Sequence, residues 1–185
     1  MTRTTYCLTT KDFAVLEVML MRRRAFADPI VPMLEGKLAE SSVVSVGAVE
    51  PEVATLSSRV VFRVDDGPAE TRTLLQGEAS APVGSGLPVG TWRGLCLLGM
   101  TAGQSALVER PDGRSERILL QDVAYQPEAA RRAVRERHSA ERRQARGFTT
   151  HGLRLVYSAA ADHWPLGGRG KIRQTEGDDP GPSAA

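Results

Sequence analysis

The sequence predicts an α+β protein, and three observations lead to that class. Apolar residues recur at helical spacing near the N-terminus, alternate at strand spacing in the middle, and give way after Pro127 to alanine, glutamate and arginine. With 185 residues, of which 41% are hydrophobic, the chain is long enough for one domain with appendages. We expect a short helical hairpin over residues 1–50, an antiparallel β domain over 51–127, and an arginine-rich helix with a flexible tail over 128–185.

The helical hairpin is predicted from two capping signals. Thr9 with Asp12 three residues later is a plausible N-cap pair for a helix over 11–24. Asp28 followed by Pro29 predicts the second helix start, with the aspartate as cap and the proline in the first turn. The apolar stripes of the two helices are Phe13, Leu16 and Leu20, and then Ile30, Leu34 and Leu38.

The β domain is predicted to begin with two strands. Alternating residues over 59–64 favour a strand that ends at the turn signal over 65–68, and a second strand is expected over 70–76. Prolines and glycines interrupt residues 82–90 so often that we expect a loop there.

A buried short helix, a second hairpin and a C-terminal helix complete the prediction. Leucines between Gly94 and Gly99 fit one or two buried helical turns. Residues 105–110 and 114–125 flank a Pro-Asp-Gly turn and predict a hairpin. Good helix formers over 128–146 predict a solvated helix, because hydrophobic anchors are scarce there, and we expect disorder after residue 167.

Composition excludes several classes of protein. Cys7 and Cys96 lack the close spacing of a zinc site or of a secreted disulfide framework. No stretch approaches the roughly 18 apolar residues that cross a bilayer, and the N-terminus lacks the order of a signal peptide. We therefore expect a cytoplasmic protein without a membrane partner.

The sequence offers no set of residues that suggests catalysis, a metal or a cofactor. Cys96 falls inside an apolar run, which favours a buried, inert thiol. The glycines over 84–90 are not followed by the lysine and serine or threonine of a phosphate loop. The three histidines lack metal-ligand spacing and are interpreted as surface residues: His138, His151 and His163.

The arginine-rich stretch leaves two interpretations open. Its arginines could neutralise the phosphates of a nucleic acid, including DNA, and bind in a salt-sensitive way. Alternatively the stretch is a solvated helix with glutamates as partial charge partners, which the absence of an interleaved aromatic residue favours. The candidate nucleic-acid-binding residues are Arg131, Arg132, Arg135, Arg142 and Arg143.

Three segments resemble a known family. Residues 53–60 with Phe62 resemble the strand that opens the C-terminal domain of the bacterial transcript-cleavage factors GreA and GreB, and residues 91–99 resemble the short helix of that domain. The ending over 125–130, Tyr-Gln-Pro-Glu-Ala-Ala, is similar to that of the Rnk family, the regulators of nucleoside diphosphate kinase. The resemblance covers about residues 8–131.

The resemblance implies an FKBP-like β domain behind the helical hairpin and a partner, RNA polymerase, bound near its secondary channel. It also implies that the short helix and the hairpin turn meet that partner. The candidate partner-binding residues are Asp28, Thr91, Trp92, Arg93, Gly94 and Leu97.

Two departures from the family pattern matter. The hairpin is short and its turn offers one carboxylate, Asp28, whereas metal-assisted hydrolysis of a phosphodiester needs more than one hard oxygen donor. Trp92 and Arg93 stand where the family has a proline and an aliphatic residue. We expect a transcription regulator that modulates elongation without transcript cleavage.

Two further hypotheses remain beside this one and the nucleic-acid binder. FKBP-like folds can host peptidyl-prolyl isomerase activity, but the β domain contributes only Phe62, Trp92 and Tyr125 to the aromatic pocket that this needs. The name of the family suggests control of nucleoside diphosphate kinase. We interpret that name as the label of a genetic effect more than of a physical contact with the kinase.

Overall fold

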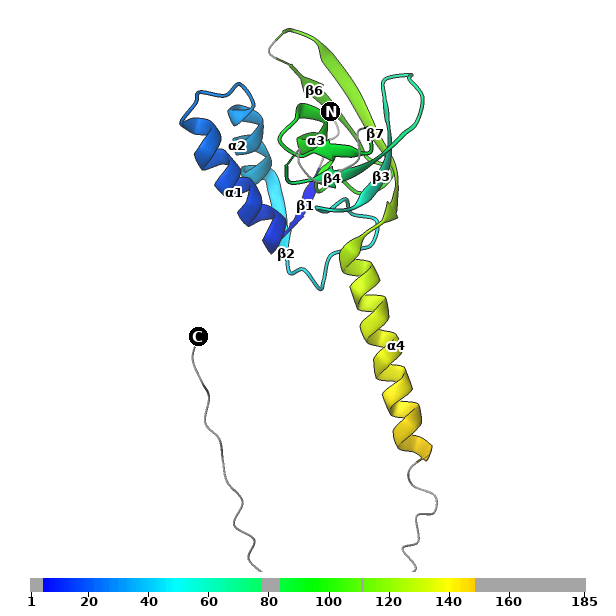
Figure 1. Cartoon of the computed structure of the whole chain (residues 1–185). Coiled ribbons are helices and arrows are strands. Elements are labelled where there is room, and N and C mark those ends of the chain that lie inside the picture. Colours follow the sequence, from blue (N-terminus) through cyan, green and yellow to red (C-terminus); the bar gives the residue numbers. More distant parts are fainter. Residues whose placement is uncertain (1–4, 78–83, 111, 149–185) are drawn as a thin grey trace, which may run out of the picture. The chain divides into compact units, whose positions relative to one another are not determined.

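Two sheets and four helices make up the described part of the chain in the computed structural model (Figure 1). The structure describes residues 5–77, 84–110 and 112–148, without the side chains of 145–148. The predicted disorder after residue 167 lies outside the described residues. None of the described helices is long and apolar enough to cross a membrane.

The N-terminal helices connect two short parallel strands. The order is β1 (Tyr6–Thr9), α1 (Thr10–Arg24), α2 (Val31–Glu40) and β2 (Ser41–Val44), with β1 paired to β2. The predicted N-cap is confirmed, because Thr9 Oγ1 accepts a hydrogen bond from the Asp12 amide at 3.0 Å. The two strands were not predicted, since each spans only four residues.

The predicted start of the second helix is wrong by two residues. Helix α2 begins at Val31, its cap residue Ile30 has no side-chain capping bond, and the proline in its first turn is Pro32. The Asp28 carboxylate instead accepts a hydrogen bond from the Ile30 amide at 3.0 Å and pairs with Arg23 of α1. Asp28 therefore closes the turn between the helices, and the helix starts only after that turn.

A five-stranded sheet forms the centre of the β domain, in the order β5-β4-β3-β7-β6. Neighbouring strands are antiparallel, except that β5 runs parallel to β4. The bounds are β3 Arg59–Val64, β4 Glu70–Leu75, β5 Gly86–Pro88, β6 Ser105–Glu109 and β7 Ser115–Tyr125. Two register shifts between β3 and β7 mark irregularities of the kind that bend a sheet.

Strand β5 corrects the prediction of a loop over residues 82–90. Its ends pair with β4 through backbone bonds, from the Thr73 amide to the Ser85 carbonyl and from the Val89 amide to the Leu75 carbonyl, at 2.9 and 2.8 Å. Because only backbone groups make these bonds, this three-residue strand shows no alternating side-chain pattern by which it could be predicted. The other predicted strands and the second hairpin are confirmed.

Helix α3 (Trp92–Leu97) packs against the sheet as the predicted buried turns. Thr91 Oγ1 caps it by accepting a hydrogen bond from the Gly94 amide at 3.2 Å. A Cβ added at Gly94 would lie 2.1 Å from the Pro88 carbonyl oxygen. Only glycine therefore lets α3 approach β5 this closely.

One hydrophobic core unites the N-terminal helices with the sheet. Leu16 of α1 and Leu34 of α2 are fully buried in the same cluster as Phe62 and Leu95. Contacts group Met1–Phe148 into one compact unit. The finer boundaries at residues 50 and 127 stay a prediction.

Helix α4 (Pro127–Phe148) is fixed to the body by polar contacts at its first turns. The buried Gln126 side chain donates to the Glu50 and Val53 carbonyls, both at 2.7 Å, and Glu128 accepts from Thr55 Oγ1 at 2.7 Å. From residue 133 to residue 144 every side chain is exposed, and the helix projects from the sheets (Figure 1). The prediction of a solvated helix is confirmed.

Candidate functional site

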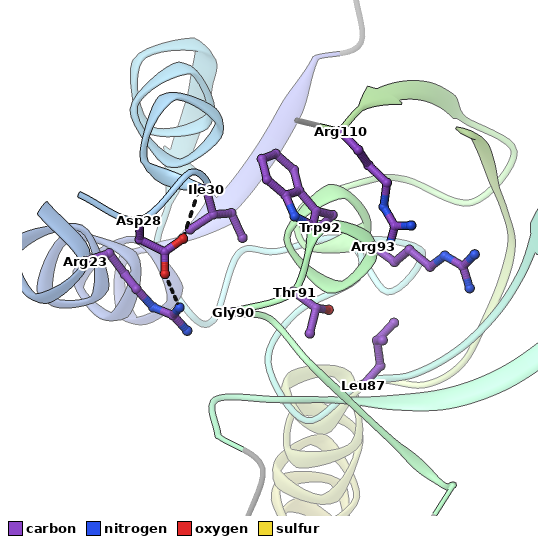
Figure 2. Close-up of a pocket in the computed structure, with 9 residues that line it drawn as sticks. All are labelled: Arg23, Asp28, Ile30, Leu87, Gly90, Thr91, Trp92, Arg93 and Arg110. Carbon is purple, nitrogen blue, oxygen red and sulfur yellow. Dashed lines mark hydrogen bonds and ion pairs between the residues drawn. The ribbon is translucent and has the colours of Figure 1, made fainter. Parts of the chain in front are cut away.

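A cleft of about 510 Å³ lies between the turn of the helical hairpin and the start of α3 (Figure 2). It collects residues that are far apart in the sequence, from the end of α1 to the end of β6. The lining residues are Arg23, Asp28, Ile30, Leu87, Gly90, Thr91, Trp92, Arg93 and Arg110.

The hairpin side of the cleft is held by one ion pair. The backbone amide of Ile30 and the guanidinium of Arg23 hold the pKa of the Asp28 carboxyl below its usual range, so this group stays ionised at neutral pH. A Cβ added at Gly90 would lie 3.0 Å from Arg23 Nη2. Arg23 therefore reaches from α1 toward the segment that leads into α3.

The opposite side of the cleft is formed by Trp92, which stands on the first turn of α3. Thr91 Oγ1 donates a hydrogen bond to the Pro88 carbonyl at 2.7 Å and also caps α3. These two bonds hold the first turn of the helix against the preceding segment. Trp92 is partly exposed and packs against the edge of the core. In Figure 2 its indole lies between the hairpin turn and the arginines of the sheet side.

The third side of the cleft is a cluster of two arginines around one carboxylate. Arg93 Nε and Nη2 donate to the two oxygens of Glu116 at 2.7 and 3.1 Å, and Arg110 Nη1 lies 3.3 Å from Oε1. The hydrogen bonds from Arg93 lower the pKa of Glu116, and Glu116 raises the pKa of Arg93 in return. The lining of the cleft therefore contains three arginines and one carboxylate, and Glu116 pairs with two of these arginines from outside the lining.

The structure places the predicted partner-binding residues in two different environments. Asp28, Thr91, Trp92 and Arg93 line the same cleft, although residues 28 and 91 are distant in the sequence. Gly94 and Leu97 are buried in α3. Burial does not favour these two residues as direct contacts, and their role toward a partner stays a prediction.

Sequence reasoning missed Arg23 and Arg110 as cleft residues. Arg23 belongs to three consecutive arginines in the last turn of α1, where positive charge interacts favourably with the helix dipole whether or not a site is near. Arg110 follows the last residue of β6 and reaches the cleft through the β6–β7 hairpin, where it pairs with Glu116. No local pattern marks either residue.

The aromatic residues of the β domain do not share one pocket. Trp92 lines the cleft, Phe62 is 1% exposed in the core, and Tyr125 is 50% exposed at the end of β7. The described residues contain no group of three histidine, cysteine, aspartate or glutamate side chains that could hold a metal ion. The cleft itself is lined by one aromatic side chain, Trp92, and by charged groups.

A buried lysine stands behind the cleft. Lys37 of α2 is 4% exposed, donates from Nζ to the Cys96 carbonyl at 2.8 Å, and lies 3.5 Å above the centre of the Tyr6 ring. Burial lowers the pKa of Lys37 to about 7 and raises the pKa of the Cys96 thiol to about 11. The prediction of a buried Cys96 is confirmed, and its raised pKa disfavours the reactive thiolate.

The predicted nucleic-acid-binding arginines lie along α4. Arg132 is partly buried because its guanidinium donates to the Gly47 and Val49 carbonyls at 2.8 to 3.1 Å. Arg131, Arg135, Arg142 and Arg143 are exposed. This group shares no residue with the cleft.

Known proteins similar to this chain are regulators. The regulator of nucleoside diphosphate kinase from Escherichia coli (strain K12) is 30% identical over 131 residues, which is 70% of this chain and 96% of that protein. This chain belongs to the family of these regulators, the Rnk family. The Rnk-family regulator of Shigella flexneri matches with the same identity and coverage. No protein-family model matches the chain.

A solved structure agrees with the fold of this Rnk-family member. A prokaryotic transcription elongation factor GreA/GreB from Nitrosomonas europaea superposes with a TM-score of 0.52 at 27% identity, over 65% of this chain and 99% of that chain. The protein therefore has a GreA/GreB-like α+β fold.

Proposed function

We propose that this protein is a non-catalytic transcription regulator that binds RNA polymerase near its secondary channel and modulates elongation. The observation that carries the proposal is the cleft, where Asp28 of the hairpin turn meets Thr91, Trp92 and Arg93 at the start of α3. These are the segments that the resemblance to GreA and GreB assigns to the polymerase. The similarity to a solved transcription elongation factor supports the same partner.

The chemistry of the cleft suits a protein partner. A partly exposed tryptophan flanked by arginines is the composition that dominates binding energy at protein interfaces. The arginines are already oriented by Glu116 and Asp28, so little side-chain freedom is lost on binding. We propose that the rim formed by residues 91–93 makes the contact, and that the buried residues of α3 only hold it in position.

We propose that the protein does not cleave transcripts, because the Asp28 carboxylate is already engaged in the hairpin turn. Its carboxylate accepts a hydrogen bond from the Ile30 amide and pairs with Arg23, which leaves it poorly placed as a metal ligand. The hairpin would border the channel without donating ligands to a catalytic metal. We propose further that residues 51–127 form an FKBP-like domain that presents this rim.

Binding of purified bacterial core RNA polymerase to the full-length protein tests the proposal. The informative variant is Arg93→Ala, since Glu116 keeps Arg110 as its partner and we expect the fold to be preserved. The matched control is Arg117→Ala on β7, an exposed arginine outside the cleft. We expect Arg93→Ala and Trp92→Ala each to weaken binding about 10-fold, as loss of a central interface residue does, and Arg117→Ala to leave it within about 2-fold.

A competition assay and a binding control with nucleoside diphosphate kinase complete the experiment. A GreB-type factor should displace the protein, and nucleoside diphosphate kinase added in place of polymerase should not be retained. No binding of polymerase at micromolar concentration by the folded protein would remove the proposal. Equal losses for Arg93→Ala and Arg117→Ala would remove the cleft as the contact site.

A further inference from the structure

Helix α4 carries five of its arginines on one side. At about 100° per residue, positions 131, 132, 135, 142 and 143 fall within about 120° of the helix circumference, whereas Arg137 faces away from them. We call the surface formed by Arg131, Arg132, Arg135, Arg142 and Arg143 the arginine face. Glu136 borders it, and Glu128 is turned into the body, where it accepts a hydrogen bond from Thr55.

Among the described residues, four of the five side chains of the arginine face are unpaired, whereas Arg132 is bonded to the Gly47 and Val49 carbonyls. Within the described part of the chain, Arg131, Arg135, Arg142 and Arg143 make no ion pair or hydrogen bond through their side chains. The helix that carries them is fastened at its root by Gln126, Glu128 and Arg132. The positive charge is therefore presented on a helix whose orientation is set before any partner binds.

The exposed part of α4 has no role in the core. All side chains from residue 133 to residue 144 are exposed, including Val134 at 50%. An isolated helix of this length is only marginally stable in water, and this one has no apolar face to pack. A partner that complements the arginine face would supply the missing stabilisation.

We propose that the arginine face binds the phosphate backbone of double-stranded DNA. From residue 131 to residue 143 the helix rises about 18 Å, a length over which duplex DNA presents about ten phosphate charges. Guanidinium groups are well matched to phosphate oxygens, and an α-helix fits the major groove of B-form DNA. This inference goes beyond the polymerase contact and involves none of the cleft residues.

The composition of α4 favours duplex DNA over two other anionic partners. A helix that lies in a membrane surface needs a continuous apolar face, which this helix lacks. Single strands are held by stacking on aromatic side chains, and residues 128–147 contain none. Binding through charge alone is independent of sequence and falls steeply with salt.

Fluorescence anisotropy with a labelled DNA duplex of arbitrary sequence and the full-length protein tests this inference. With about four contacts to phosphates, the slope of log K against log salt concentration should be about −3.6. Arg135→Glu should weaken binding about 10-fold and make the slope shallower by about one, whereas Arg135→Lys should nearly preserve it. The matched control is Arg137→Glu, because it changes the same charge on the same exposed helix two residues away.

Each outcome supports or overturns the proposal that the arginine face binds duplex DNA. Retained binding by Arg137→Glu with loss in Arg135→Glu supports it, provided that circular dichroism shows equal helix content. Equal losses in the two variants would assign the effect to net charge and overturn the proposal. Stronger binding to double-stranded RNA, to a single strand of equal length, or to vesicles of anionic lipid would also overturn it, as would no binding at low salt.

Discussion

Replacing Lys37 by methionine should remove a pH dependence of stability that the wild-type protein shows. Lys37 is buried with a pKa lowered to about 7, whereas the unfolded chain binds the same proton up to about pH 10.4. Below about pH 7 both states carry the proton, and the cost of burying the charge is then at its largest. Between the two pKa values the unfolded state binds more protons, so stability rises with pH.

The size of the effect follows from the shift. Between about pH 6 and about pH 8.5, the free energy of unfolding of the wild type should rise by about 2 kcal/mol relative to Lys37→Met. This range lies below the raised pKa of Cys96, about 11, so that thiol does not titrate in the folded state. Burial also raises the pKa of Tyr6, which keeps its phenol neutral throughout.

Urea unfolding at the two pH values, followed by circular dichroism, gives the free energies. Methionine keeps the length and volume of the lysine stem, so the variant should fold. Lys11→Met, at an exposed position of α1, serves as the control and should parallel the wild type. Parallel pH profiles for wild type and Lys37→Met would show that Lys37 retains an ordinary pKa and would refute the reasoning.

Two further substitutions test how the elements are joined. Gly94→Ala should lower the free energy of unfolding by about 2 kcal/mol in thermal or urea unfolding, since its Cβ would lie 2.1 Å from the Pro88 carbonyl oxygen; unchanged stability would mean that α3 and β5 are further apart. Gln126→Met should cost about 1–2 kcal/mol, because the Glu50 and Val53 carbonyls lose the buried amide that donates to both. Faster hydrogen exchange at the root of α4 should accompany that loss, and unchanged exchange would contradict the anchoring role of Gln126.

Most elements of this fold were predictable because their signals are local. The Thr9 cap, the alternation over 59–64 and the leucines of α3 each reflect contacts within a few residues of sequence, and all three predictions were confirmed. The start of α2 was misjudged because an aspartate before a proline can serve either a helix cap or a turn. Asp28 is held by Arg23 of the preceding helix, so its apparent capping signal serves the turn instead.

The candidate site was only half predictable because its residues come from segments that are distant in the sequence. Resemblance to a family pointed to residues 91–93 and to Asp28 separately, but nothing in the sequence indicated that they meet in one cleft. Arg110 joins them because Glu116 on the neighbouring strand holds two arginines at once. Leu97, which belongs to the same local pattern as Arg93, turned out to be buried.

The sequence by itself determined the class of fold, the family and the solvated, arginine-rich helix after Pro127, because periodicity, composition and family motifs need no partner segment. Only the tertiary structure decided which charges are neutralised, which residues meet in the cleft, and that Lys37 lies buried against Cys96 and Tyr6. Burial and charge pairing depend on segments brought together by the core, and local sequence patterns do not encode these distances.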